Sequence, residues 1–160
     1  LRGPLHGGAN EAAMELIEKM HDPEHAEVTL MGMLERKEKI MGFGHAIYSE
    51  SDPRNAVIKA WSEKLAAANG DTKLYDVSVR CEAVMWREKK LFCNADFFHA
   101  SAYNYMGIPT KLFTPIFVCS RLTGWAAHVM EQRADNRIIR PSAEYTGEEF
   151  RSVPALADRA

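Results

Sequence analysis

The sequence predicts an all-α protein. Apolar residues recur at helical spacing in six segments, and no run of alternating apolar and polar residues indicates a strand. Asp-Pro pairs at Asp22-Pro23 and Asp52-Pro53 are typical of helix starts, and Asn69-Gly70 is typical of a helix end. With 160 residues, the chain is long enough to bury a core as one domain.

The six helices are expected at residues 9–20, 23–37, 53–69, 73–90, 96–106 and 112–133. For the first four helices we expect one apolar face to point inward. In chain order these faces contain Ala12, Ala13, Leu16, Ile17 and Met20 in the first helix; Val28, Met31 and Leu34 in the second; Val57, Ile58, Trp61, Leu65 and Ala68 in the third; and Leu74, Val77, Cys81, Val84 and Met85 in the fourth. The sixth helix is apolar nearly all round, which predicts a buried helix. The polar tail from Asn136 onward, interrupted by prolines, is expected to be an extended arm.

Composition excludes several classes of function. Apolar residues make up 46% of the chain and charged residues 26%, and the net charge of −2 argues against nucleic acid or a membrane surface as a partner. The three cysteines form no Cys-x-x-Cys pair, so we expect reduced thiols in a cytoplasmic protein rather than disulfides or a metal site. Because the chain opens directly on Leu-Arg-Gly-Pro-Leu-His, we expect it to be a piece of a longer protein.

The stretch from Lys39 to Arg54 draws attention because its glycines flank a histidine. Gly42 and Gly44 allow the backbone to approach a ligand closely, and His45 with Arg54 could hold a small anion. The other candidates have simpler interpretations: His21 and His25 in a solvated turn, Asp96 as a helix cap rather than half of a metal pair with His99, His128 as a core histidine, and Arg121 as a buried arginine that needs a partner.

Five segments together resemble the citrate synthase family. Residues 3–10 (Gly-Pro-Leu-His-Gly-Gly-Ala-Asn), 42–54 (Gly-Phe-Gly-His-Ala through Asp-Pro-Arg) and 94–97 (Asn-Ala-Asp-Phe) are similar to its three signature segments. Ser120-Arg121 and Arg140-Pro141 are similar to its two later arginine sites. The resemblance implies the C-terminal portion of a multi-helical fold. Residues 1 to about 110 would be mostly the small domain, and about 111 to 160 a buried helix and C-terminal arm of the large domain. A further substrate-binding histidine would lie in an N-terminal part that precedes this chain.

The resemblance also implies the chemistry: an acyl-CoA condenses with oxaloacetate and the thioester is then hydrolysed, with no metal and no cofactor besides the acyl-CoA substrate. It implies that Asp96 is the base, that His6 stabilises the enol and that His45 polarises the ketone. The implied oxaloacetate ligands are His45, Arg54, Phe117, Arg121 and Arg140, the last from the neighbouring subunit of a homodimer or higher homo-oligomer. The implied CoA-binding residues are Lys39, Ile40, Met41, Gly42, Phe43 and Asn94.

Within the family, four stretches resemble the 2-methylcitrate synthases. They are residues 82–86, 113–118, 124–133 and 136–145. This resemblance implies propionyl-CoA as the acyl donor and a role in propionate catabolism through the methylcitrate cycle. Two alternatives stay open: a citrate synthase of the tricarboxylic acid cycle that uses acetyl-CoA, or, for the isolated segment, an inactive helical binding module.

Overall fold

The computed structural model describes residues 3, 7–147 and 152–159, and over these residues it is all-α, as predicted. One isolated antiparallel bridge, between Phe43 and Cys93, accompanies the helices. The chain divides into two compact units, Leu1–Thr123 and Gly124–Ala160. The elements are α1 (Ala9–Glu18), α2 (Pro23–Glu35), α3 (Pro53–Asn69), α4 (Lys73–Lys89), α5 (Ala95–Tyr105), the 3-10 turn η1 (Thr110–Leu112), α6 (Phe113–Ala134) and the 3-10 turn η2 (Leu156–Asp158).

The predicted helix ends are confirmed to within two residues, because local capping chemistry sets most of them. Asp22 accepts a hydrogen bond from the backbone N–H of His25 at 2.7 Å, and Pro23 occupies the first helical position. Asp52 caps α3 in the same way. The expectation that Asp96 caps the fifth helix is wrong: Asn94 caps α5, and Asp96 is the second residue of that helix. Gly70 ends α3 with a φ of 68°, a conformation that glycine adopts readily.

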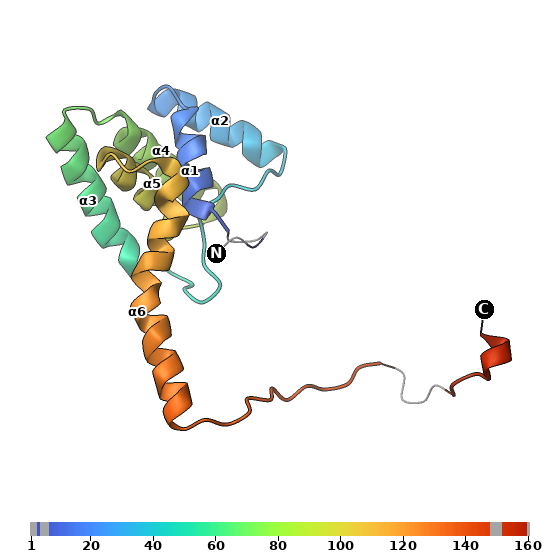
Figure 1. The fold of residues 1–160 in the computed structure, drawn as a ribbon. Coiled ribbons are helices and arrows are strands. Elements are labelled where there is room, and N and C mark those ends of the chain that lie inside the picture. Colours follow the sequence, from blue (N-terminus) through green and yellow to red (C-terminus); the bar gives the residue numbers. More distant parts are fainter. Residues whose placement is uncertain (1–2, 4–6, 148–151, 160) are drawn as a thin grey trace. The chain divides into compact units, whose positions relative to one another are not determined.

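The first unit buries its core between α1, α2, α4 and α5 (Figure 1). α3 packs against α5, α2 against α4, and α1 against α5. The inward faces expected for α1 and α4 are confirmed. The large fully buried residues are Met14, Ile17, Met20, Leu30, Val77, Val84, Phe97, Phe98 and Phe113.

The inward faces expected for α2 and α3 are partly wrong. Val28 is 70% exposed, and Val57 and Trp61 are about 60% exposed. α3 instead turns small residues toward α5, and its buried Ser62 hydroxyl lies 2.8 Å from that of Ser101. Small side chains allow two helices to approach closely, so the side of α3 that faces its neighbour is not the side with the largest apolar residues.

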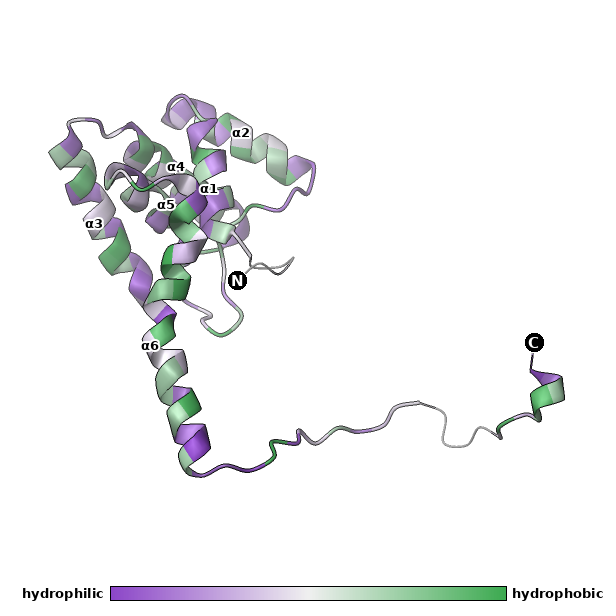
Figure 2. Cartoon of the chain, in the orientation of Figure 1, coloured by the Kyte–Doolittle hydropathy of each residue, from purple (hydrophilic) through white to green (hydrophobic). Residues whose placement is uncertain are grey.

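The expected burial of α6 is also wrong within this chain. Figure 2 shows hydrophobic residues distributed along the helix, yet Phe113 is its only buried residue in the described part of the chain. Leu122, Trp125, Val129 and Met130 are each at least 45% exposed. An all-round apolar helix is buried only if other elements surround it. The contacts of α6 with α1 and α5 involve its first turns, at Phe113, Thr114 and Phe117. Among the described residues, no helix is long and apolar enough to cross a membrane.

The three cysteines are free thiols, as expected. Cys81 and Cys93 are buried, whereas Cys119 is exposed on α6. Burial raises the pKa of Cys81 to about 12, and it raises the pKa of Cys93 as well. Burial therefore favours the protonated form of both core thiols, and they act as small apolar side chains.

The segment between α2 and α3 lies directly against the start of α5. Gly42 has a φ of 92°, and a Cβ placed on it would lie 2.8 Å from Cδ2 and 2.9 Å from Cβ of Phe97. The neighbouring Phe43 ring packs on the Phe97 ring, with centroids 4.5 Å apart. A glycine at position 42 is therefore required twice, by its backbone conformation and by the space left beside Phe97.

Replacing Gly42 by alanine should destabilise the protein by roughly 2–5 kcal/mol, since backbone strain and overpacking add together. Gly70→Ala is the matched control, because Gly70 also has a positive φ but a Cβ there would meet nothing within 4 Å. It should cost only about 1–2 kcal/mol. Urea unfolding followed by circular dichroism measures both values. Equal losses in the two variants would mean that the approach to Phe97 does not demand glycine.

Candidate functional site

Two adjoining pockets lie where α1, α3, α5 and the loop before α3 converge. The larger pocket has a volume of about 410 Å³, and three residues of α6 also line it. The smaller, of about 280 Å³, shares six lining residues with the first. Those shared residues, which form the junction of the two pockets, are Ala9, Gly44, His45, Ala46, Asn94 and Asp96.

The larger pocket brings together five residues expected to act on oxaloacetate or to serve as the base. They come from four parts of the sequence: His45, Arg54, Asp96, Phe117 and Arg121. The smaller pocket contains all six residues expected to bind CoA: Lys39, Ile40, Met41, Gly42, Phe43 and Asn94. Of the remaining candidates, His6 lies outside the described residues. Arg140 is an exposed residue of the unit Gly124–Ala160.

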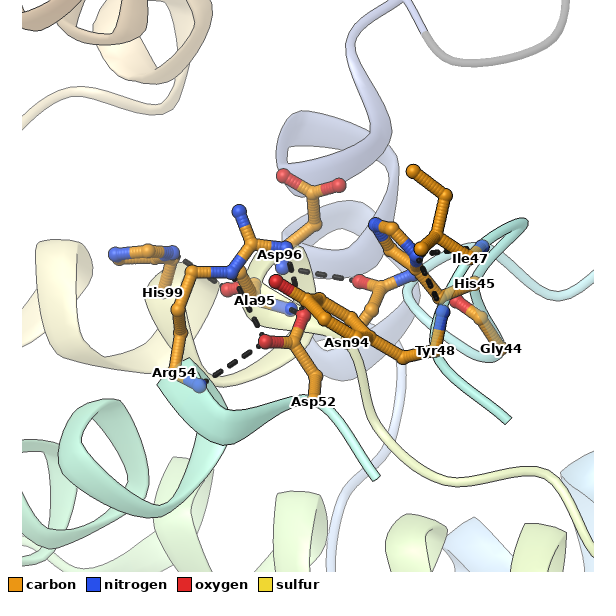
Figure 3. A network of polar contacts seen from close by, with 10 residues as sticks. All are labelled: Gly44, His45, Ile47, Tyr48, Asp52, Arg54, Asn94, Ala95, Asp96 and His99. Atoms are coloured by element: carbon orange, nitrogen blue, oxygen red, sulfur yellow. Dashed lines mark hydrogen bonds and ion pairs between the residues drawn. The ribbon is translucent and has the colours of Figure 1, made fainter. Parts of the chain in front are cut away.

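His45 is exposed at the mouth of the pockets, and its own loop orients the ring. Its Nδ1 atom accepts hydrogen bonds from the backbone N–H groups of Ile47 and Tyr48, at 3.0 and 3.2 Å (Figure 3). Because Nδ1 is an acceptor, the hydrogen of the neutral ring must be on Nε2. The loop therefore fixes a tautomer in which Nε2 is a hydrogen-bond donor, which is the form needed to polarise a carbonyl.

Asn94 ties this loop to the start of α5. Its Nδ2 group donates to the Gly44 carbonyl at 2.9 Å, while its Oδ1 atom accepts from the backbone N–H of Asp96 at 3.0 Å. Its own backbone N–H donates to the Gly42 carbonyl at 3.0 Å. Asn94 therefore reaches the expected CoA-binding pocket chiefly as a residue that holds the loop and α5 together.

Arg54 enters the larger pocket from the first turn of α3. Its Nε and Nη2 atoms donate to the two carboxylate oxygens of Asp52, at 2.9 and 2.8 Å. In Figure 3 the guanidinium is drawn between the carboxylates of Asp52 and Asp96. The Asp52 hydrogen bonds raise the pKa of Arg54, and the charge of Asp96 acts in the same direction. Arg54 is thus a fixed cation beside the candidate base.

Phe117 lines the larger pocket and packs on an aromatic ring outside it. The His99 ring lies at 5.0 Å from the Tyr103 ring and at 5.4 Å, edge-on, from the Phe117 ring. His99 Nδ1 donates to the Ala95 carbonyl, and burial lowers the pKa of the ring. These contacts support the expectation that His99 is structural rather than half of a metal pair. The described residues contain no cluster suited to a metal ion.

Two expectations about α6 are wrong. Arg121 is exposed rather than buried, and its guanidinium lies 5.5 Å from the centroid of the Phe117 ring. His128 is exposed too, with a side chain 81% accessible and Glu131 at 3.4 Å, so it is not a core histidine in this chain. Both corrections have one cause, namely that this chain supplies little to cover α6.

Several lining residues were not identified from the sequence. Gly8, Ala9, Asn10, Ala46, Ala95 and Thr114 complete the larger pocket. Asn10 is 2% exposed, and its Oδ1 atom accepts from the backbone N–H of Glu11. Asn10 belongs to residues 3–10, the first segment that resembles the family, and this position could have identified it as a site residue.

Comparison with known proteins identifies the family to which the chain is similar. The family model described as the citrate synthase C-terminal domain matches residues 1–142. A 2-methylcitrate synthase from Shewanella oneidensis is 76% identical over 99% of this chain and 42% of its own length. Citrate synthase 2 from Bacillus subtilis is 47% identical over all of this chain and 43% of its own length. The chain thus spans less than half the length of these curated relatives.

A solved structure is similar over nearly the whole chain. It is the citrate synthase of the archaeon Thermoplasma acidophilum in a ternary complex with carboxymethyl coenzyme A and oxaloacetate. The two chains share 35% sequence identity with a TM-score of 0.79, and the match covers 99% of this chain and 44% of the other.

The ion pair at Asp52 predicts how stability depends on pH. Hydrogen bonds from Arg54 lower the pKa of Asp52 from 3.8 to about 2. Because the pKa of Asp52 is lower in the folded than in the unfolded state, its ionised carboxylate stabilises the fold at pH values above the unfolded-state pKa. That stability is lost as the pH falls from about 4 to about 2. Asp52→Asn should therefore cost about 2 kcal/mol at neutral pH, and the difference from wild type should shrink over this range. Urea unfolding as a function of pH measures it; a difference that stays constant down to pH 2 would contradict it.

Proposed function

Because the chain belongs to the citrate synthase family, we propose that the whole protein condenses propionyl-CoA with oxaloacetate and water to give 2-methylcitrate and CoA. One observation carries the proposal: five residues of the expected oxaloacetate site and base line one pocket, which adjoins the pocket formed by residues 39–43. The high identity to a 2-methylcitrate synthase supports propionyl-CoA as the acyl donor, and with it a role in propionate catabolism through the methylcitrate cycle.

Oxaloacetate is a small dianion with an electrophilic ketone, and the larger pocket offers complementary groups. Arg54 and Arg121 supply two cations for its carboxylates. His45 presents Nε2–H, which can donate to the ketone oxygen and stabilise the negative charge that develops there. The aromatic ring of Phe117 also lines this pocket.

CoA would occupy the smaller pocket, along the backbone of residues 39–43. Gly42 and Phe43 hold this segment against α5, so the path of its backbone is fixed before acyl-CoA binds. The thioester would then lie at the junction of the two pockets, near Asp96. The acyl carbon of one substrate would then lie beside the ketone of the other.

The reaction needs a base, a donor for the enol and a source of water. Asp96 takes a proton from the carbon beside the thioester carbonyl, while His6 hydrogen-bonds the enol oxygen. The resulting enol carbon attacks the ketone carbon of oxaloacetate, a C–C bond forms, and the ketone oxygen takes up a proton. Water then adds to the thioester carbonyl and CoA leaves as the thiol. The scheme uses no cofactor beyond the acyl-CoA substrate.

The assembly is proposed to be a homodimer or a higher homo-oligomer. Leu122, Trp125, Val129 and Met130 expose apolar surface on α6, which further chain from the same protein or a second copy would cover. Arg140 would then reach the oxaloacetate site of a neighbouring subunit. The three cysteines form no Cys-x-x-Cys pair, and this pattern supports a reducing, cytoplasmic location.

Two alternatives have specific support. Citrate synthase 2 is 47% identical to this chain, so acetyl-CoA is the competing acyl donor. The 160-residue segment by itself would be an inactive helical module, because a site is not preorganised without the rest of its supporting structure. Saturable binding of neither CoA nor oxaloacetate by the segment would favour that second alternative.

Asp96→Asn should lower kcat for propionyl-CoA condensation by roughly 10²–10⁴-fold, because the amide cannot accept the proton. The steady-state rate of CoA release by the whole protein measures this effect. Asp135→Asn is the control, since Asp135 is an exposed carboxylate outside both pockets. A rate near wild type in Asp96→Asn would refute the assignment of the base.

The ratio of kcat/KM for the two acyl-CoA substrates separates the proposal from its main alternative. We expect propionyl-CoA to be preferred by roughly 10-fold or more, since one methylene in a fitted pocket is worth about 1–3 kcal/mol. Parallel assays at fixed oxaloacetate concentration give the ratio. A preference for acetyl-CoA would identify a citrate synthase instead.

A further inference from the structure

We propose that Asp52 is a positioning residue for the condensation, which holds Arg54 and the start of the Asp96 helix in one fixed arrangement. The inference rests on the proposed function, because it assigns oxaloacetate to Arg54 and the base to Asp96. Asp52 itself cannot touch a substrate, since its side chain is completely buried. Its effect on catalysis must therefore be transmitted through the two residues that it holds.

The number of hydrogen bonds at Asp52 exceeds what a helix cap requires. Oδ1 accepts from the backbone N–H and from Nε of Arg54, at 3.0 and 2.9 Å. Oδ2 accepts from Nη2 of Arg54 at 2.8 Å and from the backbone N–H of Ala95 at 3.0 Å. Only the first of these four bonds caps α3. The other three join the cap to a pocket cation and to a second helix, 43 residues further along the chain (Figure 3).

The first consequence concerns Arg54. Its side chain is 51% exposed, and an arginine so exposed would ordinarily sample several rotamers. The two-pronged contact with Asp52 fixes the plane of the guanidinium, and the Tyr48 ring lies 5.9 Å from its central carbon. A preoriented guanidinium can pair with a carboxylate of oxaloacetate without first losing this freedom.

The second consequence concerns Asp96. The backbone N–H of Ala95 begins α5, and Asp52 holds it directly beside the start of α3. Asn94 holds the next N–H group, that of Asp96. Asp52 therefore fixes the spacing between the cation that would hold oxaloacetate and the carboxylate that would remove the proton. A misplacement of about 1 Å between reacting groups can cost on the order of 100-fold in rate.

The chain contains a matched control for the capping role alone. Asp22-Pro23 starts α2 just as Asp52-Pro53 starts α3, and Asp22 also accepts a backbone hydrogen bond within its own helix turn. Asp22, however, is exposed and lies outside both pockets. Asparagine caps helices about as well as aspartate, so Asn at either position preserves the cap. At position 52 it removes the charge and the two-pronged contact with Arg54.

The test compares Asp52→Asn, Asp52→Glu and Asp22→Asn in the whole protein. We expect Asp52→Asn to raise KM for oxaloacetate at least 10-fold and to lower kcat at least 10-fold, with KM for propionyl-CoA within about threefold of wild type. Asp22→Asn should keep all three parameters within about twofold. Such a split between the two substrates would not arise from a general loss of structure. Wild-type parameters in Asp52→Asn would overturn the inference.

Two further measurements keep the outcome clear. Should Asp52→Asn fail to fold by circular dichroism, Asp52→Glu retains the charge but displaces it by one methylene. This variant should show the same split, and wild-type values in it would overturn the inference. Should the wild-type protein condense neither acyl-CoA, the proposed function fails, and calorimetric titration with oxaloacetate decides separately about Asp52. A dissociation constant at least 10-fold weaker in Asp52→Asn supports the positioning role, and an unchanged constant refutes it.

Discussion

The site depends on the close approach of the Gly42 backbone to Phe97. A glycine with a positive φ lets the loop between α2 and α3 lie directly on the first turn of α5. That contact brings Gly44 close enough to pair with the carbonyl of Phe92 and with the side chain of Asn94. The loop that carries His45 is thereby held by the helix that carries Asp96. Both pockets exist because these two segments meet.

Two carboxylates in the candidate site have opposite environments, which suit the different tasks proposed for them. Asp52 is buried, accepts four hydrogen bonds and stays ionised because Arg54 compensates its charge. Asp96 is half-buried and lines both pockets. Catalytic sites commonly contain one group that orients its neighbours and another group that reacts. In the proposed mechanism the orienting group, Asp52, would serve the cation Arg54 and the candidate base Asp96 together.

Sequence signals of short range predicted the fold well, whereas relations between distant segments were beyond them. Asp22-Pro23, Asp52-Pro53 and Asn69-Gly70 fix helix ends through contacts within a few residues, so those ends could be predicted. The exposed positions of Val57 and Trp61 could not, because burial depends on the side from which α5 packs. The site residues came from resemblance to a family. The bond from Ala95 to Asp52 has no sequence signature, since it joins two helix starts that only the fold brings together.

The three thiols differ in burial, and they should therefore differ in reactivity. Alkylation requires a thiolate, and the raised pKa values of Cys81 and Cys93 leave almost none at neutral pH in addition to blocking access. Cys119 is exposed on α6, the helix that also carries Phe117 and Arg121 into the larger pocket. Among the three cysteines of this chain, a maleimide fluorophore added to the native fold would therefore react with Cys119 and not with the two core thiols.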